Sequence, residues 1–173
     1  VHLVVNYIQN SCDRLGILYA TGMSSMLARR QRIPLPRPEV FRFFSDAGNL
    51  ERITLPWLRF RIVTPQPIDM HPGTRIDYRI RLHGLPLRWT SEITSWEPPC
   101  RFVDEQLRGP YRLWVHEHRF EEVTGGTEVI DTVRYSVPGG RLVERWFVER
   151  DLRRIFDFRE RQIDELLGRA DSA

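Results

Sequence analysis

Apolar and polar residues alternate along the middle of the chain, and this alternation predicts a series of β-strands. In residues 74–82, every second side chain from position 76 is apolar or aromatic, and those between are charged. Successive side chains of a strand point to opposite faces, so the segment predicts a sheet with one buried and one solvated face. Turns rich in glycine and proline separate such segments. The predicted strands are 27–33, 58–64, 74–82, 87–96, 101–107, 111–123 and 127–137.

Two segments change to the period of a helix. The first begins at Pro38, which a helix tolerates in its first turn, and ends before Gly48. Its apolar face consists of Val40, Phe43, Phe44 and Ala47. Asn49 then caps a second short helix over residues 50–55. The other segment, 141–167, lacks proline and glycine and carries an apolar stripe, which predicts one long C-terminal helix.

The order of these elements predicts a single α+β domain over residues 26–170. At more than about seven turns, the C-terminal helix is too long for a small domain unless it packs along a whole sheet. We therefore expect this helix to pack along the whole length of the sheet. Residues 1–25 lack a comparable pattern and are interpreted as a loosely held N-terminal extension.

Composition and motifs exclude several function classes. The 173 residues include 26 basic and 23 acidic side chains, and every basic one is arginine. The two signs are interleaved, which favours a solvated surface over a nucleic-acid interface. Without lysine, the chain can form neither a Schiff base nor a phosphate-binding loop with its lysine. The sequence also lacks the usual motifs of hydrolases, dinucleotide-binding dehydrogenases and zinc proteases.

The two cysteines, Cys12 and Cys100, do not have the spacing of metal ligands. Because Cys12 lies in the poorly patterned N-terminal stretch, we expect two free thiols, which suit a reducing cytoplasm. No apolar run reaches the length of a membrane span, and no secretory signal pattern is present. We expect a cytoplasmic protein, a monomer or weak dimer, with no cofactor and at most a transient membrane contact.

Several short stretches occur in a characteristic order between residues 27 and 167. They are 38–46 with Asn49 and Leu50, Gly73–Thr74, 93–99 with Arg101 and Phe102, Gly109–Pro110, Trp114, His116, His118 and Phe120, Gly126–Thr127, and Asp131, Val133 and Tyr135. Together they resemble the SRPBCC superfamily, which includes START-like proteins, birch-pollen-allergen-like proteins, and polyketide cyclases and dehydrases. The resemblance implies the helix-grip fold: a curved seven-stranded antiparallel sheet around a long C-terminal helix, with two short helices after strand one. It also implies a cavity for a lipid, quinone or polyketide-like molecule.

Trp114, His116, His118 and Phe120 alternate along one strand and therefore share a face. The two aromatic residues indicate that this face points inward, so both imidazoles lie in or beside an apolar cavity. Either imidazole can then act as an acid or base, or polarise a ligand carbonyl. Alternatively, each one only bonds to neighbouring side chains in the core. A metal site would need a third ligand, which Asp131 could supply, and we do not predict one.

The next strand carries Asp131 and Tyr135 on one face. The glycine-rich hairpin between the strands would bring Asp131 within a residue or two of His118, where it can orient the imidazole. The alternative partner is a surface arginine, Arg119 or Arg134. Asp104 and Gln106, with Phe102, form another candidate group. Its face is ambiguous because apolar residues occupy both faces of that strand, and a shift of one residue reverses every side chain.

These observations give two principal functional hypotheses. The first is a binding protein for a small hydrophobic or amphipathic ligand, such as a lipid, quinone or polyketide-like molecule. The second is a cyclase- or dehydrase-like enzyme in the same cavity, with His116 or His118 as acid or base and Asp131 as its orienting partner. A third is an interaction module that uses the surface of the long helix. The predicted ligand-binding residues are Tyr78, Trp89, Ser91, Trp114, His116, His118, Phe120, Asp131, Tyr135 and Phe156.

Overall fold

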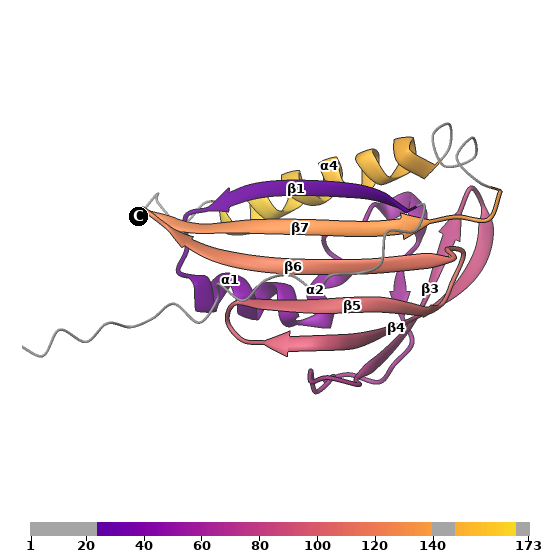
Figure 1. The fold of residues 1–173 in the computed structure, drawn as a ribbon, viewed down its shortest axis with the longest axis horizontal. Helices are drawn as coiled ribbons and strands as arrows, with labels where there is room; N and C mark the ends of the chain where they lie inside the picture. Colours follow the sequence, from indigo (N-terminus) through magenta and orange to yellow (C-terminus); the bar gives the residue numbers. More distant parts are fainter. Residues whose placement is uncertain (1–23, 140–147, 169–173) are drawn as a thin grey trace, which may run out of the picture.

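Seven antiparallel strands form one sheet in the order β1-β7-β6-β5-β4-β3-β2, and helix α4 crosses its concave face (Figure 1). The structure is a computed structural model that describes residues 24–139 and 148–168. Its elements are β1 (Ser25–Ile33), α1 (Arg37–Ser45), α2 (Ala47–Leu50), the 3₁₀ helix η1 (Pro56–Leu58), β2 (Arg61–Ile62), β3 (Arg75–Leu82), β4 (Leu85–Glu97), β5 (Arg101–Arg108), β6 (Leu113–Val123), β7 (Gly126–Ser136) and α4 (Glu149–Leu167). The α+β helix-grip fold is therefore confirmed.

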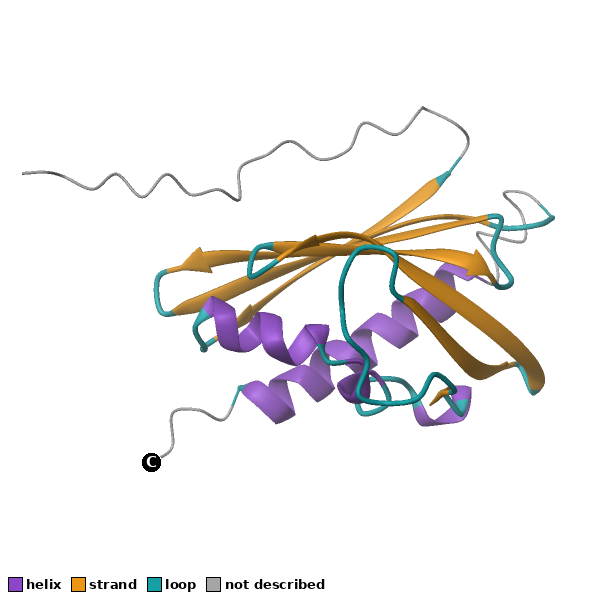
Figure 2. Cartoon of the chain, turned by 90° about the horizontal axis from the view of Figure 1, so that it is seen from below, coloured by secondary structure: helices purple, strands orange, loops and turns teal. Residues whose placement is uncertain are grey.

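The sheet is a series of neighbouring strands that the first strand completes. Strands β2 to β6 each pair with the strand that follows them in sequence. The first strand, β1, pairs with the last, β7. Helices α1, α2 and α4 all lie on the same side of the curved sheet (Figure 2). The register places His116 opposite Asp104 and His118 opposite Asp131. The pairing of His118 with Asp131 agrees with the hairpin count from the sequence.

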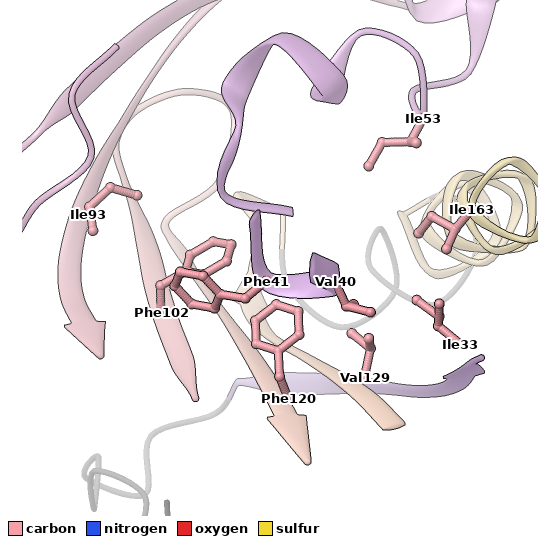
Figure 3. Packing of buried hydrophobic residues seen from close by; sticks show 9 residues of the cluster. All are labelled: Ile33, Val40, Phe41, Ile53, Ile93, Phe102, Phe120, Val129 and Ile163. Atoms are coloured by element: carbon pink, nitrogen blue, oxygen red, sulfur yellow. The ribbon is translucent and has the colours of Figure 1, made fainter. Parts of the chain in front are cut away.

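The main apolar core joins α1 to the sheet and to the C-terminal half of α4 (Figure 3). Its buried members are Ile33, Val40, Phe41, Ile53, Ile93, Phe102, Phe120, Val129 and Ile163. Phe41 contacts Phe120 and Phe102 with ring centroids 5.3 and 5.9 Å apart and steeply inclined planes, the edge-to-face arrangement that aromatic rings prefer. Val40 and Phe120 are completely buried. This core therefore fixes the position of α1 against the central strands.

A second apolar cluster joins the N-terminal half of α4 to the other end of the sheet. It contains Val133, Tyr135, Leu152 and Phe156. Because the helix packs at both ends, it spans the concave face and closes the space between the two clusters. Its described 19 residues correspond to a length of roughly 28 Å.

The boundary between the two short helices lies at Asp46, earlier in the chain than the sequence pattern predicted. The Asp46 carboxylate accepts a hydrogen bond from the backbone N–H of Gly48 at 2.8 Å, so it caps α2. Helix α1 therefore ends at Ser45, and α2 begins at Ala47 instead of following Asn49. The sequence pattern favoured Gly48 as the terminator and Asn49 as the cap because both are common in those roles.

The predicted strand over residues 58–64 is also wrong in most of its length. Residues Pro56–Leu58 form η1, and only Arg61 and Ile62 pair with β3. Arg59 adopts a left-handed conformation with φ of 44°, which is incompatible with a strand. The sequence pattern of this segment could not indicate the backbone reversal at Arg59.

Two further expectations concern the chain ends. Residues 141–147 of the predicted C-terminal helix lie outside the described residues, and so do residues 1–23 of the predicted N-terminal extension. The last residue of that extension, Ser25, is already the first residue of β1. In the part of the chain that the structure describes, no helix is long and apolar enough to cross a lipid bilayer.

Cys100 is disulfide-bonded, which corrects the expectation of a free thiol at this position. It is half-buried in the turn between β4 and β5. A disulfide depends on the spatial approach of two cysteines, which the alternation of apolar residues does not encode. Cys12 lies outside the described residues. With Cys100 oxidised, free thiols no longer indicate a reducing cytoplasm for this protein.

Replacing Phe120 with alanine should destabilise the fold strongly. Phe120 is fully buried among Phe41, Phe44 and Phe102, so the substitution removes apolar contacts and leaves a cavity. We expect the free energy of unfolding to fall by about 3–5 kcal/mol, measured by urea denaturation. The control, Leu107→Ala, removes a half-exposed side chain and should change it by less than about 0.5 kcal/mol. Similar losses in both variants would contradict the assignment of the core.

Candidate functional site

A cavity of about 190 Å³ lies between the concave face of the sheet and α4, and it is partly open to solvent. Strands β3 to β6, helices α1 and α2, the segment after α2, and α4 all contribute to its wall. Most of this wall is apolar. Its apolar residues include Phe43, Leu50, Ile53, Leu58, Phe60, Met70, Ile76, Ile80, Leu82, Ile93, Phe102, Leu152 and Ile155. The strand members face inward because of the alternation that the sequence displays in β3 and β4.

Most of the ligand-binding residues predicted from the sequence line this cavity. They are Tyr78, Trp89, Ser91, Trp114, His116, His118 and Phe156. Three others are close to it without forming its wall. Phe120 belongs to the main core, and Tyr135 belongs to the second cluster. Asp131 lies behind the histidines, on the side away from the cavity.

His116 and His118 form the polar end of the cavity together with two carboxylates. Their ring centroids are 3.8 Å apart, and both residues are almost completely buried. Behind them, Asp131 Oδ1 lies 3.2 Å from His116 Nε2 and 2.6 Å from His118 Nδ1. On the cavity side, Asp104 Oδ2 lies 3.8 Å from His116 Nδ1 and 3.4 Å from His118 Nε2. Each imidazole therefore lies between two carboxylates.

The contacts within this group differ in kind. His116 Nε2 and Asp131 form a hydrogen bond, as do His118 Nε2 and Asp104. His118 Nδ1 approaches Asp131 closely but out of line, so this is an ionic contact without an aligned hydrogen bond. The surface alternative for Asp131 does not apply to Arg119, which pairs with Glu117 and Glu121.

Both carboxyl groups of the cluster have a lowered pKa despite their burial. Burial alone would raise the pKa of Asp104, but the hydrogen bond with His118 and the charges of His116, His118 and Arg159 outweigh it. Burial likewise acts to raise the pKa of Asp131. The charges of His118 and Arg159, with the hydrogen bond to His116 and the close contact with His118, hold the pKa of Asp131 well below its usual value. Both residues are therefore carboxylates at neutral pH.

The pKa values of the two imidazoles shift in opposite directions. Burial lowers the pKa of His116, and the charge of His118 lowers it further against the opposing effect of Asp131. Burial also acts to lower the pKa of His118. The charge of Asp131, its close contact with the ring and the hydrogen bond with Asp104 raise the pKa of His118 instead. Of the two imidazoles, His118 is therefore the one that more readily carries a proton.

Ser91 links the aromatic wall to Asp104. Trp89 Nε1 donates to Ser91 Oγ at 3.0 Å, and the Tyr78 hydroxyl lies 2.9 Å from the same oxygen. Ser91 in turn donates to Asp104 Oδ1 over a longer 3.4 Å. Burial and the charge of Asp104 raise the pKa of Tyr78 well above its usual value, so its hydroxyl remains a donor. Burial also raises the pKa of Tyr111, another residue of the wall.

Arg159 and the inward position of Asp104 were not predicted. Arg159 projects from α4 into the cavity, with its guanidinium 5.6 Å from the Phe44 ring centroid and 5.9 Å from that of Phe156. Among residues 24–139 and 148–168, it has no ion-pair partner within 4.0 Å. The spacing in the sequence could have indicated Arg159, because it lies three residues after Phe156 and four before Ile163 and therefore on the apolar face of α4. Asp104 had no clear signal, because Phe102 and Val103 are both buried.

Replacing Ser91 with alanine should destabilise the protein by about 1–3 kcal/mol, because it leaves the buried Trp89 N–H and the Tyr78 hydroxyl without their shared partner. The measurement is urea denaturation, and the matched control is Ser136→Ala in β7. Ser136 is half-buried, and no hydrogen bond of its side chain occurs in the described structure. Equal stability of the two variants would argue against Ser91 as the link in this network.

Comparisons with solved structures place the fold among known proteins. Protein TTHA0849 from Thermus thermophilus superposes with a TM-score of 0.63 at 20% identity, over 86% of this chain and 100% of that one. Protein Ms6760 from Mycobacterium smegmatis gives 0.63 at 19% identity, over 83% and 90% of the two chains. Ara h 8.0201 gives 0.61 at 13% identity, over 83% and 97%. Identities this low support the shared fold alone.

The sequence comparison defines the family. No curated protein matches the chain. The family model described as "Polyketide cyclase / dehydrase and lipid transport" matches residues 33–163, which include every strand from β2 to β7, the two short helices and most of α4. The match covers most of the chain and agrees with the SRPBCC resemblance read from the sequence. The chain therefore belongs to the polyketide cyclase/dehydrase and lipid transport family of the SRPBCC superfamily.

Proposed function

We propose that this protein binds a small, largely apolar molecule in the cavity between the sheet and α4. The observation that carries the proposal is a largely apolar cavity wall into which one cluster of buried polar groups, at Asp104, His116 and His118, is set. Such sites gain affinity from apolar burial, while a few fixed polar groups set the orientation of the ligand. The family name, which includes lipid transport, supports a hydrophobic ligand without identifying it.

The size of the cavity narrows the ligand class. Its volume of about 190 Å³ is below the roughly 300–1,000 Å³ of pockets that enclose drug-sized molecules. A fused polycyclic polyketide could not be enclosed entirely. A single-ring quinone, or the end of an acyl chain that enters through the opening, suits the space better. A ligand carbonyl or hydroxyl would lie at the polar end, near His116 and Arg159.

One observation favours the enzymatic alternative. A cyclase- or dehydrase-like reaction needs an imidazole nitrogen that a ligand can reach. His116 Nδ1 lies 3.8 Å from the nearest carboxylate oxygen, too far for a hydrogen bond, and its residue lines the cavity. Asp131 meanwhile holds the other nitrogen of the same ring. Binding is the simpler proposal because it requires only the cavity.

A transient contact with membranes is a separate proposal, supported by a row of arginines on the outer face of the sheet. Arg61 of β2 lies opposite Arg79 of β3, which lies opposite Arg88 of β4. All three are exposed, and none has an ion pair within the described residues. Like charges directly opposite each other destabilise a sheet, so the row suits an anionic surface such as acidic lipid headgroups. Leu85, 68% exposed in the β3–β4 hairpin, could enter the interface.

Filling the cavity with a larger side chain should weaken ligand binding. Ile80 lines the cavity from β3, and its neighbour Arg81 is exposed on the outer face. We expect duroquinone or octanoate to quench tryptophan fluorescence saturably, because Trp89 and Trp114 are in the wall. Ile80→Trp should weaken this binding by at least about tenfold, or 1.4 kcal/mol, and Arg81→Trp should leave it unchanged. The titrations include a chelator. Absence of saturable binding of both ligands, or equal losses in the two variants, would contradict the proposal.

Reversing the charge of the arginine row should reduce membrane binding. The wild-type protein should sediment with vesicles that contain phosphatidylserine, less so as salt rises, and not with pure phosphatidylcholine vesicles. Arg79→Glu with Arg88→Glu should lower the affinity at least about tenfold, because each lost arginine removes about 1 kcal/mol of attraction. The control is Arg154→Glu, at an exposed position of α4. An equal loss in the control, or equal binding to neutral vesicles, would exclude a specific role of the row.

A further inference from the structure

Three side chains of the kinds that bind transition metals converge at the polar end of the cavity. Asp104 of β5 and His116 and His118 of β6 each offer one ligand atom, and these atoms all lie within 4.8 Å of one another. Asp104 Oδ2 lies 3.4 and 3.8 Å from the nearest histidine nitrogens. Ligand atoms of a tetrahedral zinc ion are about 3.3–3.6 Å apart, so small side-chain movements would complete such a site.

Asp131 contacts the far nitrogen of both imidazoles, through a hydrogen bond at His116 and a close ionic contact at His118. The ring nitrogens that point away from Asp104 both face Asp131 Oδ1, at 3.2 Å for His116 and 2.6 Å for His118. Metal-binding histidines typically direct their far nitrogen to a carboxylate, which leaves the lone pair of the near nitrogen for the metal. Here one carboxylate behind the rings serves two histidines, and the converging nitrogens belong to the opposite side.

We propose that Asp104, His116 and His118 bind a divalent transition-metal ion, Zn²⁺ or Fe²⁺, with Asp131 as the outer carboxylate that orients both histidines. Two nitrogen donors and one oxygen donor suit either ion. The three residues also line the cavity, which leaves a coordination position for water or a ligand atom. Three protein ligands with an open position are typical of catalytic zinc sites and differ from the closed sites that only stabilise a fold.

The charges around the site suggest the nature of the remaining ligand. The carboxylates of Asp104 and Asp131 would balance the charge of a divalent ion, and Arg159 lines the same cavity. The site with its metal would then carry one excess positive charge. An anionic oxygen, such as hydroxide or a ligand enolate or carboxylate, would neutralise it. The metal would bind that oxygen and Arg159 would stabilise its charge, which makes the polar end selective for oxyanions.

This site differs from the metal option considered in the sequence analysis. There, Asp131 was the only candidate for a third ligand, and no metal was predicted. In the structure, Asp131 lies behind the rings, and Asp104 of the preceding strand faces the converging nitrogens. The inference goes beyond the proposed ligand-binding function, because it concerns the protein without any organic ligand.

The test uses the full-length protein without a histidine tag, stripped of metal with a chelator. Calorimetric titration with Zn²⁺ should give one site per chain. Co²⁺ should give visible absorption bands of a four- or five-coordinate ion. Asp104→Asn and His118→Gln should each weaken Zn²⁺ binding more than about 100-fold, and Asp131→Asn about 10- to 100-fold. The control, His71→Gln, alters an exposed histidine and should change the affinity less than about twofold.

Several outcomes would overturn the proposal. They are absence of Zn²⁺ binding to the wild-type protein, a Co²⁺ spectrum of a six-coordinate aqueous type, and unchanged affinity in a folded Asp104→Asn variant. Circular dichroism establishes folding, and Asp104→Asn keeps the size of the side chain in case His118→Gln does not fold. Because the titrations contain no organic ligand, and the quinone and octanoate titrations contain a chelator, failure of the metal site and failure of ligand binding are distinguishable.

Discussion

The burial of two carboxylates in an otherwise apolar sheet face is the constraint on which the site depends. A buried charge without a partner destabilises a fold by several kcal/mol, so Asp104 and Asp131 require neighbouring cations or hydrogen-bond donors. The histidines of β6 meet this requirement because they lie opposite Asp104 on one side and Asp131 on the other. A shift of one residue in either pairing would move these side chains to opposite faces. The cluster therefore selects the register of β5, β6 and β7 and forms the polar end of the cavity.

The cavity exists because a straight helix crosses a curved sheet. Helix α4 packs through Ile163 against the main core and through Leu152 against the second cluster. Between these contacts the sheet bends away, and large side chains such as Phe156 and Trp114 cover its wall without filling the gap. Apolar burial at the two ends thus stabilises an arrangement that leaves space in the middle. The same packing holds Arg159 over the polar end.

The sequence pattern predicted the features that neighbouring residues determine, such as strand faces and hairpin pairing. Alternation in β3 assigned its inward face, and the glycine hairpin brought Asp131 opposite His118. The position of Asp104 could not be assigned because Phe102 and Val103 are buried on opposite faces, which removes the usual contrast between the faces of a strand. The helix boundary at Asp46 depended on a competition between two possible caps, and the disulfide at Cys100 depends on proximity in space. Arg159 has a role only because the fold carries it to the histidines.

The cavity wall combines short elements with long, well-paired strands. Helix α2 has four residues and η1 has three, so few backbone hydrogen bonds hold this side of the wall. The polar groups instead stand on β5, β6 and β7, which are long and paired along most of their length. Insertions and substitutions are tolerated best where the backbone is least constrained. The shape of the cavity can therefore change through substitutions in these short segments, while the polar groups on the long strands keep their geometry.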